Sequence, residues 1–134
     1  MEQRSFTVGE KEVEGFQASA LKQDELLSLL TPRLVQTFLN AGKLGADVST
    51  KSLSIMLMSL PHDTKAKIAD LLTEKIFIKD QKIRVSVKDF QGQMVAWNTL
   101  LAELLAWNLS DFFDLLRSDL QSVTQETKAQ DEKM

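Results

Sequence analysis

Few side chains of this chain could carry out chemistry, and their spacing argues against an active centre. His62 is the only histidine among 134 residues, and cysteine and tyrosine are absent, so catalysis has few acid–base or nucleophilic groups to use. The carboxylates of Asp111, Asp114 and Asp119 are close enough in sequence to suggest a metal cluster. Asp111, however, stands at a predicted helix start, where the helix dipole explains a carboxylate without a metal. His62 beside Asp63 is interpreted as a surface residue at another helix start. We therefore predict no enzyme, no metal site and no cofactor site.

Glycine placement and charge argue against further classes of function. The five glycines, at positions 9, 15, 42, 45 and 92, are too scattered for a phosphate-binding loop or a dinucleotide fingerprint. The net charge is −3 and no dense run of Lys and Arg occurs, so nucleic-acid binding is not expected. The N-terminus lacks the apolar core of a signal peptide, and no run reaches the ~18 apolar residues of a membrane span. These features predict a soluble cytoplasmic protein that binds neither nucleic acid nor membrane.

The elements that would position any binding residues follow from hydrophobic periodicity, which predicts a mainly α fold (α+β) of about five helices. A small N-terminal β-hairpin precedes the helices. In residues 4–16, Phe6 and Val8 alternate with polar residues before Gly9 interrupts the pattern. This arrangement predicts two short strands with Gly9 in the turn between them.

A leucine-rich stripe predicts a helix over residues 19–41. Its apolar positions recur at steps of three and four, at Leu27, Leu30, Leu34 and Phe38. Pro32 lies inside the stripe, so either Thr31 caps a new helix with Pro32 at its first position, or one long helix is kinked there. Asn40-Ala41-Gly42 is a stop signal, and residues 42–50 are predicted to be a linker.

Two shorter helices and a second hairpin are predicted next. The inner face of the first helix carries Leu53, Met56, Leu57 and Leu60, and that of the second, which opens after Pro61, carries Ile68, Leu71, Leu72 and Ile76. The period then changes to two at Ile83, Val85 and Val87, which predicts a half-buried strand. With residues 76–78 as its partner, this strand would form a second short hairpin. Asp89 is placed to cap the helix that follows.

The stretch from Gln93 to Leu120 is the most apolar part of the chain. One face of its first helix carries Trp97, Leu101, Leu104 and Asn108, flanked by Met94 and Leu100 and widened by Leu105 and Trp107. Only Thr99, Ala102, Glu103 and Ala106 lie opposite, so this helix is predicted to be buried on most sides. Ser110 is placed to cap a second helix that runs through Leu120.

Asn108 is the polar residue on the apolar face of this helix. We interpret it as a buried hydrogen-bonding residue that ends one helix and orients the next; direct contact with a partner's backbone is the alternative. After Leu120 the apolar rhythm stops. Residues 1–120 are predicted to form one helical domain, and residues 121–134 a flexible polar tail.

The order of these elements resembles that of the tail assembly chaperones of long-tailed bacteriophages. The resemblance covers roughly residues 4–120 and includes the N-terminal hairpin, the segment LLTPRLV and the Leu-Pro boundary in SLPHDTKAKIADLL. Its C-terminal signature is a long apolar helix, then Asn, then a Phe-Phe pair that opens a last helix. Here Trp97 and the signature residues Trp107, Asn108, Phe112 and Phe113 carry that match. Many members have a tryptophan-containing segment where this chain has IFIKDQKIRVSV.

The resemblance implies a non-catalytic function in the cytoplasm of a bacterial host. Such chaperones bind the tape measure protein, a long apolar helical chain, and keep it soluble until tail tube protein, a transient partner, displaces them. Several copies or a homo-oligomer are expected along so repetitive a ligand, and the resemblance also implies a longer, frameshifted form of the protein. We predict a partner groove between the C-terminal helices and the leucine-rich stripe, with the candidate residues Leu27, Leu30, Leu34, Phe38, Met94 and Trp97.

Two other classes of function remain as alternatives. One is a different small helical adaptor, regulatory protein-binding module or secretion-type chaperone, which would share the acidic surface and the helical grooves. The other is an enzyme or a nucleic-acid-binding domain, which a convergent polar pocket or a basic groove would favour.

Overall fold

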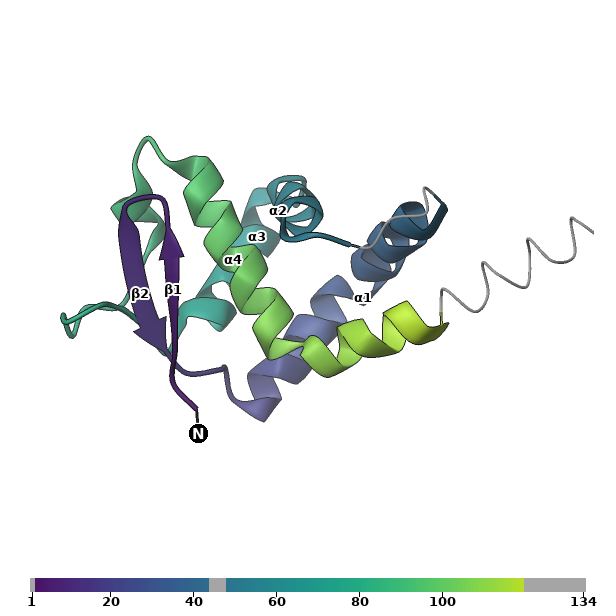
Figure 1. Cartoon of the computed structure of the whole chain (residues 1–134), viewed down its shortest axis with the longest axis horizontal. Coiled ribbons are helices and arrows are strands. Elements are labelled where there is room, and N and C mark those ends of the chain that lie inside the picture. Colours follow the sequence, from purple (N-terminus) through teal and green to yellow (C-terminus); the bar gives the residue numbers. More distant parts are fainter. Residues whose placement is uncertain (1, 44–47, 120–134) are drawn as a thin grey trace, which may run out of the picture.

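The computed structural model describes residues 2–43 and 48–119, without the side chain of Lys43, and within these ranges the fold is mainly α with a small sheet (Figure 1). The elements are, in order, β1 (Arg4–Val8), β2 (Lys11–Gly15), α1 (Ala20–Lys43), α2 (Thr50–Met58), α3 (His62–Thr73), β3 (Ile76–Ile78), the 3-10 helix η1 (Val87–Phe90) and α4 (Met94–Asn108). A further helix occupies residues 110–119. The predicted mainly α fold of about five helices with an N-terminal hairpin is confirmed in this part of the chain. The predicted tail, residues 121–134, lies outside it.

The sheet is three-stranded and antiparallel, in the order β1-β2-β3. β1 and β2 form the predicted hairpin, with Phe6 opposite Val13 and with Gly9 in the turn at a φ of 59°. Val13 also lies opposite Ile78 of β3. Gly15 closes the second pair, and a Cβ atom on it would lie 2.0 Å from the Lys75 carbonyl oxygen. The close approach of these two backbones therefore requires glycine at position 15.

The predicted second hairpin forms only as a short antiparallel pairing of residues 76–78 with residues 83–85. β3 uses one edge to pair with β2, and its other edge forms one antiparallel bridge, between Phe77 and Arg84. Two backbone hydrogen bonds flank this bridge, from the Ile78 amide to the Ile83 carbonyl at 2.9 Å and from the Val85 amide to the Ile76 carbonyl at 3.0 Å. Val85 is buried as the alternation predicted, but Ile83 and Val87 are 57% and 47% exposed. The strand cannot continue because the chain turns into η1, where the Asp89 carboxylate accepts a hydrogen bond of 2.8 Å from the Ser86 amide. Of the three alternating apolar residues, therefore, only Val85 is buried, and the alternation does not mark a buried strand face.

α1 is one continuous helix with Pro32 inside it, so of the two alternatives at this proline the single long helix holds. Thr31 does not cap a new helix, because its hydroxyl donates a hydrogen bond to the Leu27 carbonyl one turn earlier. The helix runs to Lys43, slightly beyond the predicted stop signal. Ser49 caps α2 by accepting a hydrogen bond of 3.1 Å from the Ser52 amide.

α4 lies at the centre of the molecule, between the sheet on one side and α2 and α3 on the other (Figure 1). The prediction that this helix is buried on most sides is confirmed. Its core side chains are Trp97, Leu100, Leu101, Leu104, Leu105 and Trp107. Ala102, predicted on the open face, is also fully buried, because elements cover the helix from both sides. The exposed apolar residues of α4 are at its start, where Met94 is 46% and Val95 71% exposed.

The two residues predicted to cap α4 and the last helix, Asp89 and Ser110, do not occupy the N-cap positions of these helices. Asp89 closes the capping box of η1 instead of capping α4, whose N-cap is Gln93. Ser110 is already helical, and the Leu109 carbonyl accepts the first hydrogen bond of the last helix, from the Phe113 amide at 3.0 Å. In each case a tight turn before the helix occupied the position that the sequence assigned to the cap.

Candidate functional site

Four of the six candidate partner-binding residues belong to the core. Leu30 and Leu34 are fully buried, and Phe38 and Trp97 are 5% and 4% exposed. Phe38 packs against Phe113 of the last helix, with 5.5 Å between ring centroids. The last helix thus closes the space where the sequence placed a groove. Leu30, Leu34 and Phe38 are therefore corrected to core residues, whereas Trp97 is a core residue that also lines a cleft. Leu27 is partly buried and Met94 is exposed.

The signature residues pack against other elements of the fold. The Trp107 ring lies 5.5 Å from the ring of Phe6 on β1, and the Arg4 guanidinium lies 5.0 Å from the Trp107 ring centroid. Phe113 is buried, and Phe112 is partly buried against the core. These contacts are structural and offer little open surface.

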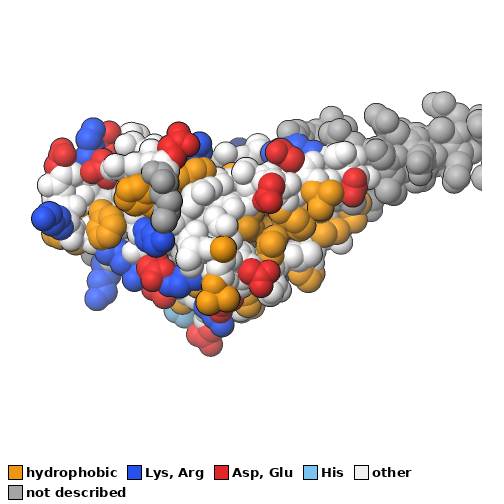
Figure 2. Space-filling model, turned by 90° about the horizontal axis from the view of Figure 1, so that it is seen from below, with side chains coloured by type: hydrophobic (Ala, Val, Ile, Leu, Met, Phe, Trp, Pro, Cys, Tyr) orange, Lys and Arg blue, Asp and Glu red, His pale blue; other side chains and the backbone are white. Residues whose placement is uncertain are grey.

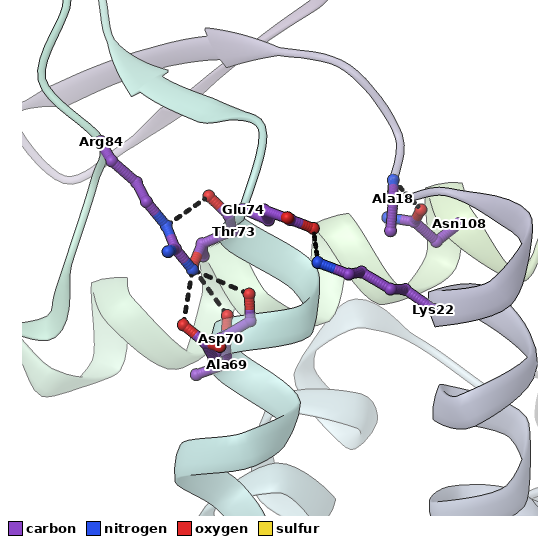
Figure 3. A network of polar contacts seen from close by, with 8 residues as sticks. All are labelled: Ala18, Lys22, Ala69, Asp70, Thr73, Glu74, Arg84 and Asn108. Atoms are coloured by element: carbon purple, nitrogen blue, oxygen red, sulfur yellow. Dashed lines mark hydrogen bonds and ion pairs between the residues drawn. The ribbon is translucent and has the colours of Figure 1, made fainter.

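Asn108 is buried at the last position of α4, and both ends of its amide form hydrogen bonds. Its Oδ1 accepts from the Ala18 amide at 2.8 Å and from Gln23 Nε2 at 3.2 Å, and its Nδ2 donates to the Leu104 carbonyl at 2.8 Å. Figure 3 shows the contact with Ala18, which lies in the segment between β2 and α1. Asn108 therefore ties the end of α4 to the chain that leads into α1, as its structural interpretation predicted.

An open cleft of about 480 Å³ lies between α3, the segment of residues 84–87 and the start of α4. Val85 and Trp97, both nearly buried, line its base, while Met94 and Val87 line it from exposed positions. The face of α3 toward the cleft carries Ala66 and Ala69, whose small side chains leave the space open. The lining is therefore mostly apolar, and it brings together two of the predicted partner-binding residues, Met94 and Trp97.

Arg84 fixes the distance between the two walls of this cleft. Its guanidinium donates from Nε to the Thr73 carbonyl at 3.1 Å, and from Nη2 to the Asp70 carbonyl at 2.9 Å and the Asp70 carboxylate at 2.7 Å (Figure 3). α3 has no basic residue in its own last turn, so Arg84 supplies the cation that the negative end of this helix favours. The segment of residues 84–87 is thereby anchored to the end of α3.

Lys65 lines the same cleft and differs from the other lysines near it. Its side chain is half-buried and makes no hydrogen bond or ion pair with any residue that the structure describes. Burial lowers the pKa of its ammonium group, and no carboxylate offsets the effect. Lys67, two residues later on α3, instead forms an ion pair with Glu25, with 3.0 Å between its Nζ and the Glu25 Oε1. The cleft thus combines an apolar base with one unpaired cation.

The remaining candidate groups are accounted for by local contacts. The Asp111 carboxylate accepts a hydrogen bond from the Phe112 amide, and Asp114 pairs with Arg117 at 3.1 Å. In residues 2–43 and 48–119, no three His, Asp or Glu side chains gather as a metal site would require. His62 is exposed at the start of α3, on the rim of the cleft. In the same part of the chain, no helix has the length and apolar character to cross a membrane.

A second apolar surface lies on the half of the molecule formed by α1 and the helix of residues 110–119. Figure 2 shows hydrophobic side chains gathered there. The apolar residues of these two helices that keep some exposure include Leu27, Val35, Phe112 and Leu115, the last of which is 54% exposed. Nothing in the described residues indicates what covers this surface.

Sequence reasoning did not find the α3 side of the cleft. Lys65, Ala66 and Ala69 lie outside the apolar stripe of α3, which points into the core through Ile68 and Leu72. The sequence feature that could have indicated it is the pair of alanines, Ala66 and Ala69, beside Lys65. Residues three apart share a helix face, and two small side chains leave space on that face. Arg84 and Val85 were assigned to a strand, which concealed their place in the cleft wall.

Glu103 provides a test of the electrostatics of α4. It is half-buried, and burial raises the pKa of its carboxyl. Because its folded pKa lies above the unfolded one, the folded protein keeps this proton to a higher pH, and stability falls as pH rises between the two values. Glu103→Gln stays neutral, so above the folded pKa it is expected to exceed the wild type by about 0.5 kcal/mol, and below the unfolded pKa to lose that advantage. Urea denaturation over a range of pH measures this, with Glu10→Gln in the exposed β1–β2 turn as control. A constant difference at all pH values would contradict it.

Comparison of the chain with protein-family models, with curated proteins and with solved structures gives no match. Two features of the chain bear on its function: the resemblance in the order of its elements and the apolar cleft at the start of α4.

Proposed function

We propose that the protein is a non-catalytic chaperone of phage tail assembly that binds the tape measure protein in the cytoplasm of the bacterial host. The cleft between α3, residues 84–87 and the start of α4 receives apolar side chains of that helical partner. The observation that carries this proposal is the position of Met94 and Trp97, which line an open apolar cleft at the start of the helix that bears the resemblance.

The physical basis is the docking of an amphipathic helix. A helix presents apolar side chains at steps of three and four, and an apolar groove shields them from water. A cleft of about 480 Å³ has the size of sites that enclose a few side chains rather than a whole protein surface. Each contact is then weak, so several copies of the chaperone, or a homo-oligomer, would act along one tape measure protein, and a frameshifted longer form of the chain would be a further partner. Tail tube protein would displace them as it polymerises.

Co-expression with the tape measure protein tests this proposal. We expect that the wild-type chain keeps that protein in the soluble fraction and co-purifies with it. Met94→Glu is expected to reduce the co-purified amount several-fold, because it places a carboxylate at the apolar cleft. The variant should fold, since α4 has no acidic residue in its first turn and a carboxylate there is favoured by the helix dipole.

The matched control is Val95→Glu, the same change one residue later. Val95 is 71% exposed and does not line the cleft, so this variant is expected to behave as the wild type. A tape measure protein that stays insoluble and does not co-purify with the wild-type chain would rule out the proposal and favour a helical adaptor of another kind. Unchanged binding by Met94→Glu would place the partner surface away from the cleft.

A further inference from the structure

The unpaired cation in the cleft indicates more about the partner than an apolar lining alone. Three other lysines of the described residues have carboxylate partners: Lys22 pairs with Glu74, Lys67 with Glu25, and Lys79 with Glu12. Lys65 is half-buried beside Ala66 and Ala69 and has no such partner among the described residues. A partly desolvated ammonium without a counter-ion lowers stability, and a ligand that supplies a carboxylate would remove that cost.

The local charge supports the same assignment. Asp70 is the one carboxylate that lines the cleft in the described part of the chain, and Arg84 neutralises it through a contact of 2.7 Å. Lys65 therefore leaves the cleft with a positive charge, although the whole chain has a net charge of −3. Arg84 also keeps one nitrogen, Nη1, without a hydrogen bond among the described residues, because its contacts use Nε and Nη2. The rim thus has cationic donors that the fold does not use.

We propose that this cleft selects helical segments in which a carboxylate stands beside the apolar stripe, and that Lys65 pairs with that carboxylate. The inference rests on the proposed function insofar as it takes the occupant to be a helix. Apolar side chains enter between Ala69, Val87 and Met94, and the ion pair with Lys65 fixes which turn of the partner occupies the cleft. Lys65 therefore supplies selectivity along a partner whose apolar stripe repeats many times.

Three labelled synthetic peptides test this selectivity by fluorescence anisotropy. All carry the same leucine stripe at steps of three and four, with both ends blocked, and the residues flanking the stripe are glutamate, glutamine or lysine. The wild-type protein is expected to bind the glutamate peptide about fivefold more tightly than the glutamine peptide, the effect of one partly exposed ion pair. The lysine peptide should bind most weakly. The preference for glutamate should decrease as salt is added.

Lys65→Gln is the decisive variant. It is expected to bind the glutamate and glutamine peptides with equal affinity, within about twofold. It should unfold in urea no earlier than the wild type, because the Lys65 side chain makes no hydrogen bond or ion pair with the described residues that the change would remove. Lys67→Gln is the matched control. It removes a cation from the same helix, two residues away and outside the cleft, and should keep the fivefold preference.

Three results would overturn the inference: equal binding of the glutamate and glutamine peptides to the wild type, a preference that persists in Lys65→Gln, or no binding of any peptide. Sedimentation of the chain alone tests another occupant, because a dimer that Met94→Glu dissociates would assign the cleft to a second copy. Co-expression separates this inference from the proposed function. Co-purification of the tape measure protein with both the wild type and Lys65→Gln, without peptide selectivity, would reject the role of Lys65 and leave the chaperone function standing.

Discussion

Replacing Trp97 by alanine is expected to lower the free energy of unfolding by about 3–5 kcal/mol. Trp97 is 4% exposed, and its ring lies 5.4 Å from the ring of Phe90, which is fully buried. Removal of the indole would leave a cavity between η1 and α4, and the surrounding core would relax only in part. Urea denaturation followed by circular dichroism measures the change.

Val95→Ala serves as the control for this prediction. Val95 is two residues away on the same helix but 71% exposed, so its truncation should change stability by less than about 0.5 kcal/mol. Phe112 is only partly buried against the core, so replacing it by alanine should lower the free energy of unfolding by less than Trp97→Ala does. If Trp97→Ala kept near-normal stability but lost partner binding, Trp97 would be a ligand-facing residue and its assignment to the core would be wrong.

Asn108→Leu is expected to destabilise the fold by about 3 kcal/mol. The change keeps a side chain of similar size but removes the acceptor for the Ala18 amide and for Gln23 Nε2. The Ala18 amide would then be buried without a partner, and the link between α4 and the start of α1 would be lost. Thermal and urea unfolding measure the effect.

The same substitution at Asn98 gives a matched comparison. Asn98 is also a buried asparagine of α4, ten residues earlier, but its Oδ1 has no hydrogen-bond partner among the described residues. Its Nδ2 donates only to the Met94 carbonyl of the same helix. Asn98→Leu is therefore expected to change stability by about 1 kcal/mol or less in either direction. Equal destabilisation by the two variants would show that side-chain shape, rather than the hydrogen bonds of Asn108, holds this junction.

Elements with a long, regular apolar pattern could be predicted from the sequence. The stripe from Leu27 to Phe38 predicted a helix, and the alternation around Phe6 and Val8 predicted the hairpin, because these periods depend only on which side chains one face must bury. Features that depend on competition between neighbouring turns were predicted less well. Asp89 and Ser110 were both assigned as caps, yet η1 and the turn at Leu109 precede the helices in those places.

The candidate site shows the same division. Met94 and Trp97 were identified from their place on an apolar helix, and both line the cleft. The sequence could not distinguish which apolar stripe another part of the chain would cover. Leu30, Leu34 and Phe38 are core residues, and the last helix packs on Phe38 through Phe113.

By itself, then, the sequence determined the helical periods, the turn at Gly9 and the apolar character of the central helix, since each follows from local residue pattern and backbone preference. Only the tertiary structure decided where that apolar surface stays open. The cleft exists because Arg84 attaches residues 84–87 to the end of α3 beside the small side chains of Ala66 and Ala69. Segments that are distant in sequence create it together with Met94 and Trp97. No local sequence pattern encodes the separation between the walls of the cleft, because this separation depends on long-range contacts that form only when the whole chain packs.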